Sequence, residues 1–128
     1  MTESECIFCK ISKGDIPSKK VYEDENYLAF LDANPKSKGH TLVIPKKHYE
    51  TFLDMPNEEE RELFGKVQEV SKTLKEKLGA ELIFLLVMGE EVPHTHVHLI
   101  PHYGEKMPFC LKGSDESDLD EVLEQIKQ

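Results

Sequence analysis

Short alternating runs of apolar and polar residues occupy the first part of the chain. Residues 20–23 and 27–32 are β-prone runs separated by a turn-favouring cluster at 24–26, and together they predict a hairpin. A third run, 40–44, ends at Pro45, which cannot donate a hydrogen bond to a central ladder. The pattern therefore predicts three consecutive strands.

The spacing of the apolar residues changes after residue 56. Leucines and valines then recur at intervals of three and four, which is the period of a helix with one buried face. Asn57 and Glu60 have the spacing of a capping box, and Gly79 stands where a left-handed C-terminal cap is expected. The sequence predicts a long helix between these limits, with the following residues on its buried face: Leu63, Val67, Val70, Leu74 and Leu78.

Two more strands and a second helix are predicted in the last third of the chain. The apolar run 82–88 predicts a strand buried on both faces, and residues 89–91 form the turn into an alternating stretch at 92–100. Strands joined by tight turns, with two separated helices, indicate an antiparallel α+β fold. The second helix, over 117–128, starts near Ser117 and has its apolar face formed by Leu119, Val122, Leu123 and Ile126.

Three histidines lie in the alternating stretch at 92–100. On a strand, His94, His96 and His98 project to one side, and the residues between them project to the other side. Because that reverse side is largely apolar and would pack on the core, the three imidazoles are expected to point outward, roughly 6–7 Å apart. Such a row indicates chemistry rather than a polar surface with incidental histidines.

Two chemistries fit a row of imidazoles. Neutral imidazole is a common ligand of zinc, copper and nickel, although same-face positions on a strand are widely spaced for three ligands of one ion. A neutral imidazole is also a nucleophile near pH 7, and a backbone carbonyl can fix its attacking tautomer. Neighbouring imidazoles would then bind phosphoryl oxygens and protonate the leaving group. The pattern alone leaves both open.

Composition and charge narrow the class of protein. The 128 residues contain no internal repeat or linker, which indicates a single domain over 1–128. The net charge of −9, from 25 acidic and 16 basic residues, would repel a nucleic acid polymer. No apolar stretch resembles a signal peptide, and the run 82–88 is too short to span a membrane, so we expect a cytoplasmic protein without membrane contact. Three cysteines argue against a disulfide framework.

The alternating stretch resembles the signature of the histidine triad (HIT) family. His94-Thr-His96-Val-His98-Leu-Ile matches the family's alternation of histidine and apolar residues, with Thr95 as a mild departure. The likeness runs in order from about Cys6 to Pro101 and implies the HIT fold, an antiparallel five-stranded sheet with two main helices. It is carried by the segments 6–11, 14–18, 21–24, 29–32 and 38–49.

The resemblance implies roles for individual residues. His96 would attack the α-phosphate of a nucleotide and form a covalent nucleotidyl-imidazole intermediate that water later releases. His98 would contact the phosphate oxygens, and His40 would support the triad. Asp32 would accept hydrogen bonds from the ribose hydroxyls, and Gly89 is a candidate backbone donor near the phosphate. The base would lie in an apolar slot formed by Ile7, Phe8, Ile11, Ile16 and Leu42.

The resemblance also implies a reaction. A homodimeric hydrolase of the nucleoside phosphoramidase type would act on a purine nucleotide or nucleoside phosphoramidate, without a catalytic metal. Dinucleoside polyphosphate hydrolysis and nucleotidyl transfer stay open, as does a non-catalytic nucleotide-binding adaptor. The stretch 87–92 favours the adaptor hypothesis, because it is short and lacks the Asn, Gln and hydroxyl that many family members carry there. Glu90 and Glu91 would repel an anionic substrate unless they turn to solvent.

A cysteine pair near the N-terminus indicates a metal. Cys6-x-x-Cys9 supplies half of a tetrahedral zinc site. In the zinc-containing branch of the family, the other two ligands resemble His48 and His94, so the resemblance implies a structural zinc that staples the N-terminal segment to the sheet. His94 would then be a ligand and not a catalytic acid. Cys110 is interpreted as a free thiol without a role, and His102 as a surface residue.

Overall fold

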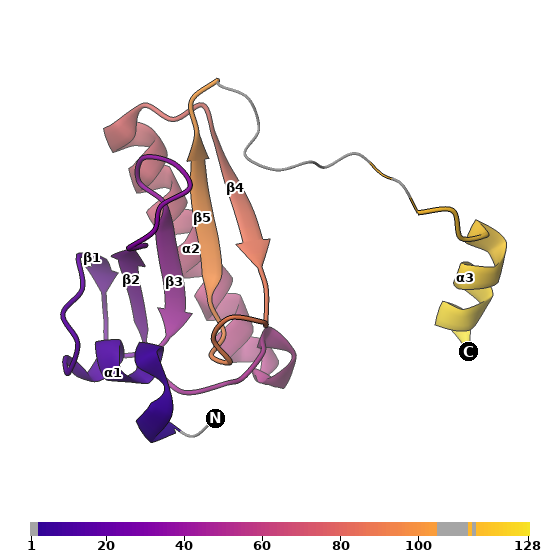
Figure 1. The fold of residues 1–128 in the computed structure, drawn as a ribbon, viewed down its shortest axis with the longest axis horizontal. Helices are drawn as coiled ribbons and strands as arrows, with labels where there is room; N and C mark the ends of the chain where they lie inside the picture. The colour runs from indigo at the N-terminus through magenta and orange to yellow at the C-terminus, as the bar shows by residue number, and fades with distance from the viewer. Residues whose placement is uncertain (1–2, 105–112, 114) are drawn as a thin grey trace.

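The computed structural model describes residues 3–104, 113 and 115–128. Figure 1 shows a five-stranded sheet with a long helix behind it and a short helix near the N-terminus. The five strands and the two predicted helices confirm the α+β fold. The structure also contains a third, short helix that was not predicted. The strands are β1 (Lys20–Glu23), β2 (Tyr27–Leu31), β3 (Thr41–Pro45), β4 (Leu82–Val87) and β5 (Val97–His102), and the helices are α1 (Ile7–Lys13), α2 (Asn57–Leu78) and α3 (Leu119–Lys127).

The sheet has the strand order β1-β2-β3-β5-β4, and each neighbouring pair is antiparallel. β5 lies between β3 and β4 although β3 and β5 are far apart in the sequence. In the β3–β5 ladder, Leu42 is opposite His98 and Val43 is opposite Val97. Residues opposite each other in a ladder share a face, so this register decides which side of the sheet receives the histidine.

Each face of the sheet has its own apolar core because side chains alternate along the strands. On one face, Val43 and Val97 pack with Leu63 and Val67 of α2. On the other face, Leu42 packs in a second cluster that includes residues of α1. His98 is opposite Leu42 and therefore lies on the α1 face. The predicted apolar reverse side of the histidine row is confirmed, since Val97 and Leu99 both lie in the α2 core.

The prediction that the imidazoles point outward is wrong. His94, His96 and His98 are 0%, 2% and 6% exposed, because α1 covers this face of the sheet. The predicted strand over 92–100 is also only partly correct. β5 begins at Val97 and runs to His102, while residues 92–96 lie before the ladder starts. The chain at His94 and His96 is therefore held by something other than sheet pairing.

The predicted burial of the run 82–88 on both faces is wrong as well. β4 is an edge strand, and Leu82 and Leu85 are 54% and 50% exposed. A continuous apolar run is typical of a buried strand, but here its position at the end of the strand order leaves it partly uncovered. The result is an apolar sheet edge, which is uncommon in proteins that remain monomeric.

Helix boundaries show which local signals are reliable. Gly79 ends α2 with a φ of 75°, which confirms the predicted left-handed cap. Asn57 is not the N-terminal cap, because the helix already includes it and Pro56 takes the cap position. Helix α3 is confirmed, but its cap is Asp118 rather than Ser117. The seven-residue helix α1 was not predicted, since it is too short to show a period.

Helix α3 stands apart from the sheet in Figure 1, and all of its side chains are exposed, including the predicted apolar face. Cys110 lies outside the described residues, so the structure gives no view of its thiol. Among residues 3–104, 113 and 115–128, no helix has both the length and the apolar character required to cross a bilayer.

Gly39 is expected to be costly to replace. Its φ is 88°, and a Cβ there would collide with Cδ1 of Leu78 and lie 3.4 Å from Cγ of Pro101. Gly14 is a matched control, because its φ is 84° and a Cβ would meet nothing within 4 Å. We expect Gly14→Ala to cost about 1–2 kcal/mol from the backbone alone, and Gly39→Ala about 1 kcal/mol more because Leu78 must move. Denaturant unfolding of both variants measures the difference, and equal losses would contradict the steric contribution.

Candidate functional site

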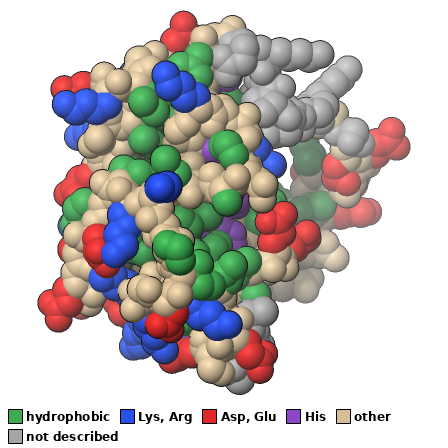
Figure 2. All heavy atoms as spheres, turned by 60° about the vertical axis from the view of Figure 1, so that its left-hand side comes forward, with side chains coloured by type: hydrophobic (Ala, Val, Ile, Leu, Met, Phe, Trp, Pro, Cys, Tyr) green, Lys and Arg blue, Asp and Glu red, His purple; other side chains and the backbone are tan. Residues whose placement is uncertain are grey.

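A cavity with a volume of about 830 Å³ lies on the α1 face. Figure 2 shows histidine side chains among hydrophobic ones in the middle of this face, with charged side chains around them. Two of the three triad histidines, His96 and His98, line the cavity, together with the carboxylate-bearing Asp32. An apolar hollow with a few converging polar groups is the usual form of a small-molecule site.

The structure brings most of the predicted nucleotide-site residues to this cavity. Ile7, Phe8, Ile11, Ile16 and Leu42 line it together. His40 lies behind the wall in contact with His98, and Gly89 is not among the lining residues. Glu91 of the acidic loop also lines the cavity. The sequence did not single out nine other lining residues, which come from segments beside the predicted ones: Pro17, Ser18, Lys19, Phe30, Leu31, Ala33, Asn34, Pro35 and Val92.

The imidazole of His96 has a defined tautomer. Its Nδ1 lies 2.7 Å from the backbone carbonyl oxygen of His94. A carbonyl oxygen can only accept a hydrogen bond, so Nδ1–H donates and the neutral ring carries its lone pair on Nε2. The ring of Phe8 meets that of His96 edge to face, with centroids 5.0 Å apart. A lone pair held on Nε2 in this way can act as a nucleophile.

A backbone amide sets the tautomers of two more histidines. The N–H of Lys36 donates to Nδ1 of His40 at 3.0 Å, so a neutral His40 carries its proton on Nε2. That Nε2 lies 2.9 Å from Nδ1 of His98 and donates to it. A neutral His98 then carries its proton on Nε2, which is buried and has no hydrogen-bond partner within the described part of the chain. His98 therefore presents an unused donor beside His96.

Burial keeps this histidine pair neutral. The pKa of His98 is lowered from 6.5 to about 4, mainly by removal from solvent and then by the neighbouring His96 and His40, against smaller opposing effects of the carboxylates of Asp32 and Glu91. Burial also lowers the pKa of His40, against an opposing effect of Asp32. Both rings are consequently neutral near pH 7, as the tautomer assignment requires.

This lowered pKa predicts a loss of stability in mild acid. The unfolded state takes up a proton on His98 below about pH 6.5, whereas the folded state takes it up only near pH 4. Stability is therefore complete above pH 6.5 and falls as the pH decreases toward 4. We expect His98 to account for a loss of about 2 kcal/mol between pH 7 and pH 5. Denaturant unfolding at both pH values measures it, and the loss should be smaller by about this amount in His98→Gln.

Asp32 lies at the end of β2, where it lines the cavity beside the histidines. Its Oδ1 accepts the backbone N–H of Asn34 at 2.8 Å, and its Oδ2 lies 3.5 Å from Nε2 of His40. A carboxylate has further acceptor capacity beyond these two contacts. Asp32 can therefore accept hydrogen bonds from hydroxyl groups placed in the cavity.

The acidic loop before the triad reaches the rim of the cavity. Glu90 and Glu91 are both exposed, and Glu91 is among the lining residues. Both side chains therefore reach solvent, where water screens their charge. Glu91 nevertheless adds negative charge at the edge of the site, on the side of His98.

The predicted zinc ligands form a second group of side chains. The ligand atoms of Cys6, Cys9, His48 and His94 all lie within 4.8 Å of one another. Sγ of Cys6 lies 3.3 Å from Nδ1 of His94, and Sγ of Cys9 lies 3.3 Å from Nδ1 of His48. In a tetrahedral zinc site, sulfur and nitrogen ligands are about 3.6 Å apart. The residues therefore fit a tetrahedral ion with two sulfur and two nitrogen ligands.

The state of His94 supports this fit. Its Nε2 donates to the carbonyl oxygen of Pro45 at 2.7 Å, which leaves the lone pair on Nδ1, the atom that faces the thiols. Burial lowers the pKa of His94 to about 4, so the ring is neutral. Burial and the adjacent Cys6 raise the pKa of Cys9 to about 12, and a cation bound between the ligands would stabilise its thiolate there.

The row of histidines does not act as one metal site in this structure. His94 belongs to the cysteine group, while His98 belongs to a separate cluster with Asp32 and His40. Among the described residues, His96 is in neither cluster. The interpretation that a single ion binds all three triad histidines is therefore not supported.

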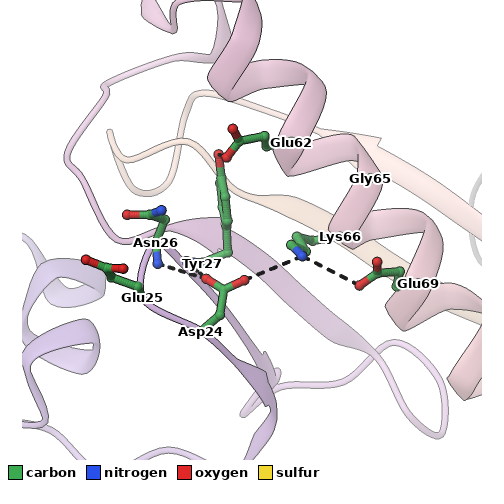
Figure 3. Close-up of a pocket in the computed structure, with 8 residues that line it drawn as sticks. All are labelled: Asp24, Glu25, Asn26, Tyr27, Glu62, Gly65, Lys66 and Glu69. Atoms are coloured by element: carbon green, nitrogen blue, oxygen red, sulfur yellow. Dashed lines mark hydrogen bonds and ion pairs between the residues drawn. The ribbon is translucent and has the colours of Figure 1, made fainter.

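Another depression lies between the β1–β2 turn and α2, and Figure 3 shows the residues that line it. Its single cation is paired: Nζ of Lys66 lies 3.6 Å from a carboxylate oxygen of Asp24 and 3.8 Å from one of Glu69. The hydroxyl of Tyr27 donates to Glu62 at 3.1 Å. This depression carries no histidine or cysteine and is not a candidate active site.

Comparison with known proteins agrees with the geometry. The model of the HIT domain matches residues 13–105. An uncharacterised HIT-like protein of Methanocaldococcus jannaschii is 50% identical, over 95% of this chain and 98% of its own. An adenosine 5′-monophosphoramidase of Saccharomyces cerevisiae is 34% identical over 94% of this chain and 77% of its own. A solved HIT family protein of Bacillus subtilis has a TM-score of 0.82 and 39% identity, covering 96% of this chain and 92% of that one. The chain belongs to the HIT family.

Proposed function

We propose that this protein is a nucleotide hydrolase that releases a nucleoside monophosphate from a purine nucleoside phosphoramidate. The main supporting observation is the tautomer of His96. Its Nδ1–H donates to the carbonyl oxygen of His94, so Nε2 keeps the lone pair. The phosphate would lie beside the donor on Nε2 of His98, and the base would lie in the apolar slot. The similarity to a yeast adenosine 5′-monophosphoramidase supports the same substrate class.

The proposed reaction has two displacements at phosphorus. Nε2 of His96 attacks the α-phosphorus, the bond from phosphorus to the leaving amine breaks, and the amine takes up a proton from water. Nε2–H of His98 donates to a phosphoryl oxygen and stabilises the charge that develops there. Water then attacks the phosphorus and loses a proton to the hydroxide left by the first step, the bond to His96 breaks, and the monophosphate leaves. His96 recovers its lone pair.

Trapping the covalent intermediate tests this proposal. Full-length protein is incubated with an adenosine phosphoramidate, quenched in milliseconds to seconds, and digested for mass spectrometry. We expect an adenylyl group on His96 and steady release of AMP. Saturable AMP binding without turnover and without an adduct would overturn the hydrolase and favour the adaptor. An adduct formed equally well from a dinucleoside polyphosphate would favour the alternative substrate class.

We further propose that Cys6, Cys9, His48 and His94 hold a structural zinc ion. The support is the set of four soft or borderline ligand atoms within 4.8 Å of one another, with no fifth described ligand in the group. A bound zinc would supply cross-links between the N-terminal segment and the sheet. Elemental analysis of protein purified without added metal should give about one zinc per chain. Zinc-free protein with an unchanged unfolding temperature would contradict this role.

We also propose a homodimer that uses the edge of β4. The strand carries no charged residue, and Leu82 and Leu85 expose half of their surface there. Native proteins usually protect such an edge by pairing it or by adding charge. Leu85→Lys should therefore shift the protein from dimer to monomer in light scattering, whereas Leu53→Lys, at a residue 78% exposed in the loop before α2, should not. A dimer unaffected by Leu85→Lys would place the interface elsewhere.

A further inference from the structure

The four-residue metal group and the nucleophile share one residue. His94 contributes its imidazole to the group with Cys6 and Cys9, and its backbone carbonyl accepts the hydrogen bond from His96. We propose that this group positions the catalytic His96, and that Cys6, Cys9 and His48 are positioning residues for the reaction proposed above. This role goes beyond stapling the N-terminal segment.

The first argument is that sheet pairing does not hold this part of the chain. At the N-terminal end of β5, both ladders stop at Val97, which pairs with Val43 of β3 and with Val87 of β4. Residues 92–96 lie outside these ladders. The N–H and hydroxyl of Thr95 both donate to the carbonyl of Tyr49, at 2.7 and 3.0 Å, which ties the backbone to the segment that bears His48.

The second argument concerns His94 itself. Its ring is held on both edges, by the carbonyl of Pro45 at Nε2 and by the sulfurs of Cys6 and Cys9 at Nδ1, 3.3 and 3.5 Å away. Its own carbonyl lies 2.7 Å from Nδ1 of His96. The imidazole and the backbone carbonyl of His94 are separated by only a few covalent bonds. If the imidazole could move, the carbonyl could therefore rotate away from His96. His96 would then lose the acceptor that fixes its tautomer.

The third argument is a second route through α1. Phe8 lies between the two cysteines in sequence and packs edge to face on both His94 and His96, with centroids 5.9 and 5.0 Å away. Helix α1 has only seven residues, a length that is not stable alone. Its N-terminal cap is the thiol of Cys6, which accepts the N–H of Cys9 at 3.4 Å. The cysteines therefore also fix the aromatic wall of the nucleophile.

The test compares tautomer and kinetics in the full chain. Long-range ¹H–¹⁵N correlation spectra report which nitrogen of each histidine carries the proton, and the spectrum of His96→Asn assigns the signals of His96. Wild type, without nucleotide, should show a single Nδ1–H form of His96. In Cys9→Ser, we expect a mixture of tautomers and a 10- to 100-fold lower kcat with KM changed by less than about threefold. Removing zinc from wild type with a chelator should give the same mixture of tautomers and the same loss of kcat, and both should reverse when zinc is added back. This second experiment keeps the test valid if Cys9→Ser folds poorly.

Two controls separate positioning from general damage. Lys10→Ser introduces serine at the neighbouring position of α1 without replacing a ligand, and Leu74→Ala destabilises the core on the opposite face of the sheet. Both should keep the Nδ1–H form of His96. An unchanged His96 spectrum and kcat in metal-free protein would overturn the inference, as would a rise in KM alone. A wild type that forms no adduct would instead overturn the proposed reaction, while the spectra still test the positioning.

Discussion

His96→Ala is expected to lower kcat for an adenosine phosphoramidate by about 10⁴-fold or more, because the substitution removes the proposed nucleophile. His96 is buried, has a defined tautomer and lines the cavity beside Asp32. Substrate should still bind, since the apolar slot and the donor on His98 remain. The measurement combines steady-state kinetics with the adduct assay, in which the variant should show no adenylyl group.

His102→Ala is the matched control for that variant. His102 is the last residue of β5, packs against the ring of Phe84 and is absent from the lining of the cavity. Its replacement should change kcat by less than about threefold, with an unfolding temperature close to that of wild type. A His96→Ala protein that retained more than about 1% of the wild-type kcat would contradict nucleophilic catalysis by His96.

The second large effect is expected at His40. His40→Ala removes the donor to Nδ1 of His98 and the acceptor for the N–H of Lys36. The ring of His98 can then take either tautomer, so its Nε2 no longer donates to phosphate at all times. We expect kcat to fall by about 10²-fold, with a smaller change in KM. Leaving buried polar groups unpaired should also cost about 1–3 kcal/mol of stability.

His40→Gln tests the polarity of this chain of hydrogen bonds. A glutamine amide has both an N–H donor and a carbonyl acceptor, so it can receive the N–H of Lys36 and donate to His98. The kcat of His40→Gln should be at least about tenfold higher than that of His40→Ala. Equal activity of the two variants would show that His40 acts through packing and not through the tautomer of His98.

Local periodicity predicted the elements whose signals are local. The interval of three and four between Leu63 and Leu74 specifies one face of α2. The alternation around His98 specified which residues share its face. Gly79 could be recognised because a left-handed cap depends on one residue type. These features need no knowledge of distant contacts.

The errors concern features that depend on distant parts of the chain. The exposure of Leu85 follows from the place of β4 in the strand order, which no periodicity encodes. The burial of the imidazoles follows from α1, a helix too short to predict. Likewise, the contact of the Lys36 amide with His40 depends on a loop conformation. For the metal group, spacing indicated only Cys6 and Cys9, and the resemblance to the family supplied both histidines.

The two faces of the sheet differ in how firmly they are covered. The 22-residue helix α2 closes one face with a contiguous core, whereas the seven-residue α1 closes the other and forms a wall of the nucleotide cavity. Local unfolding should therefore begin on the α1 side, at a free energy well below that of global unfolding. Amide hydrogen exchange there would report partial opening while α2 stays protected. Nucleotide exit through such an opening would link product release to the stability of one short helix.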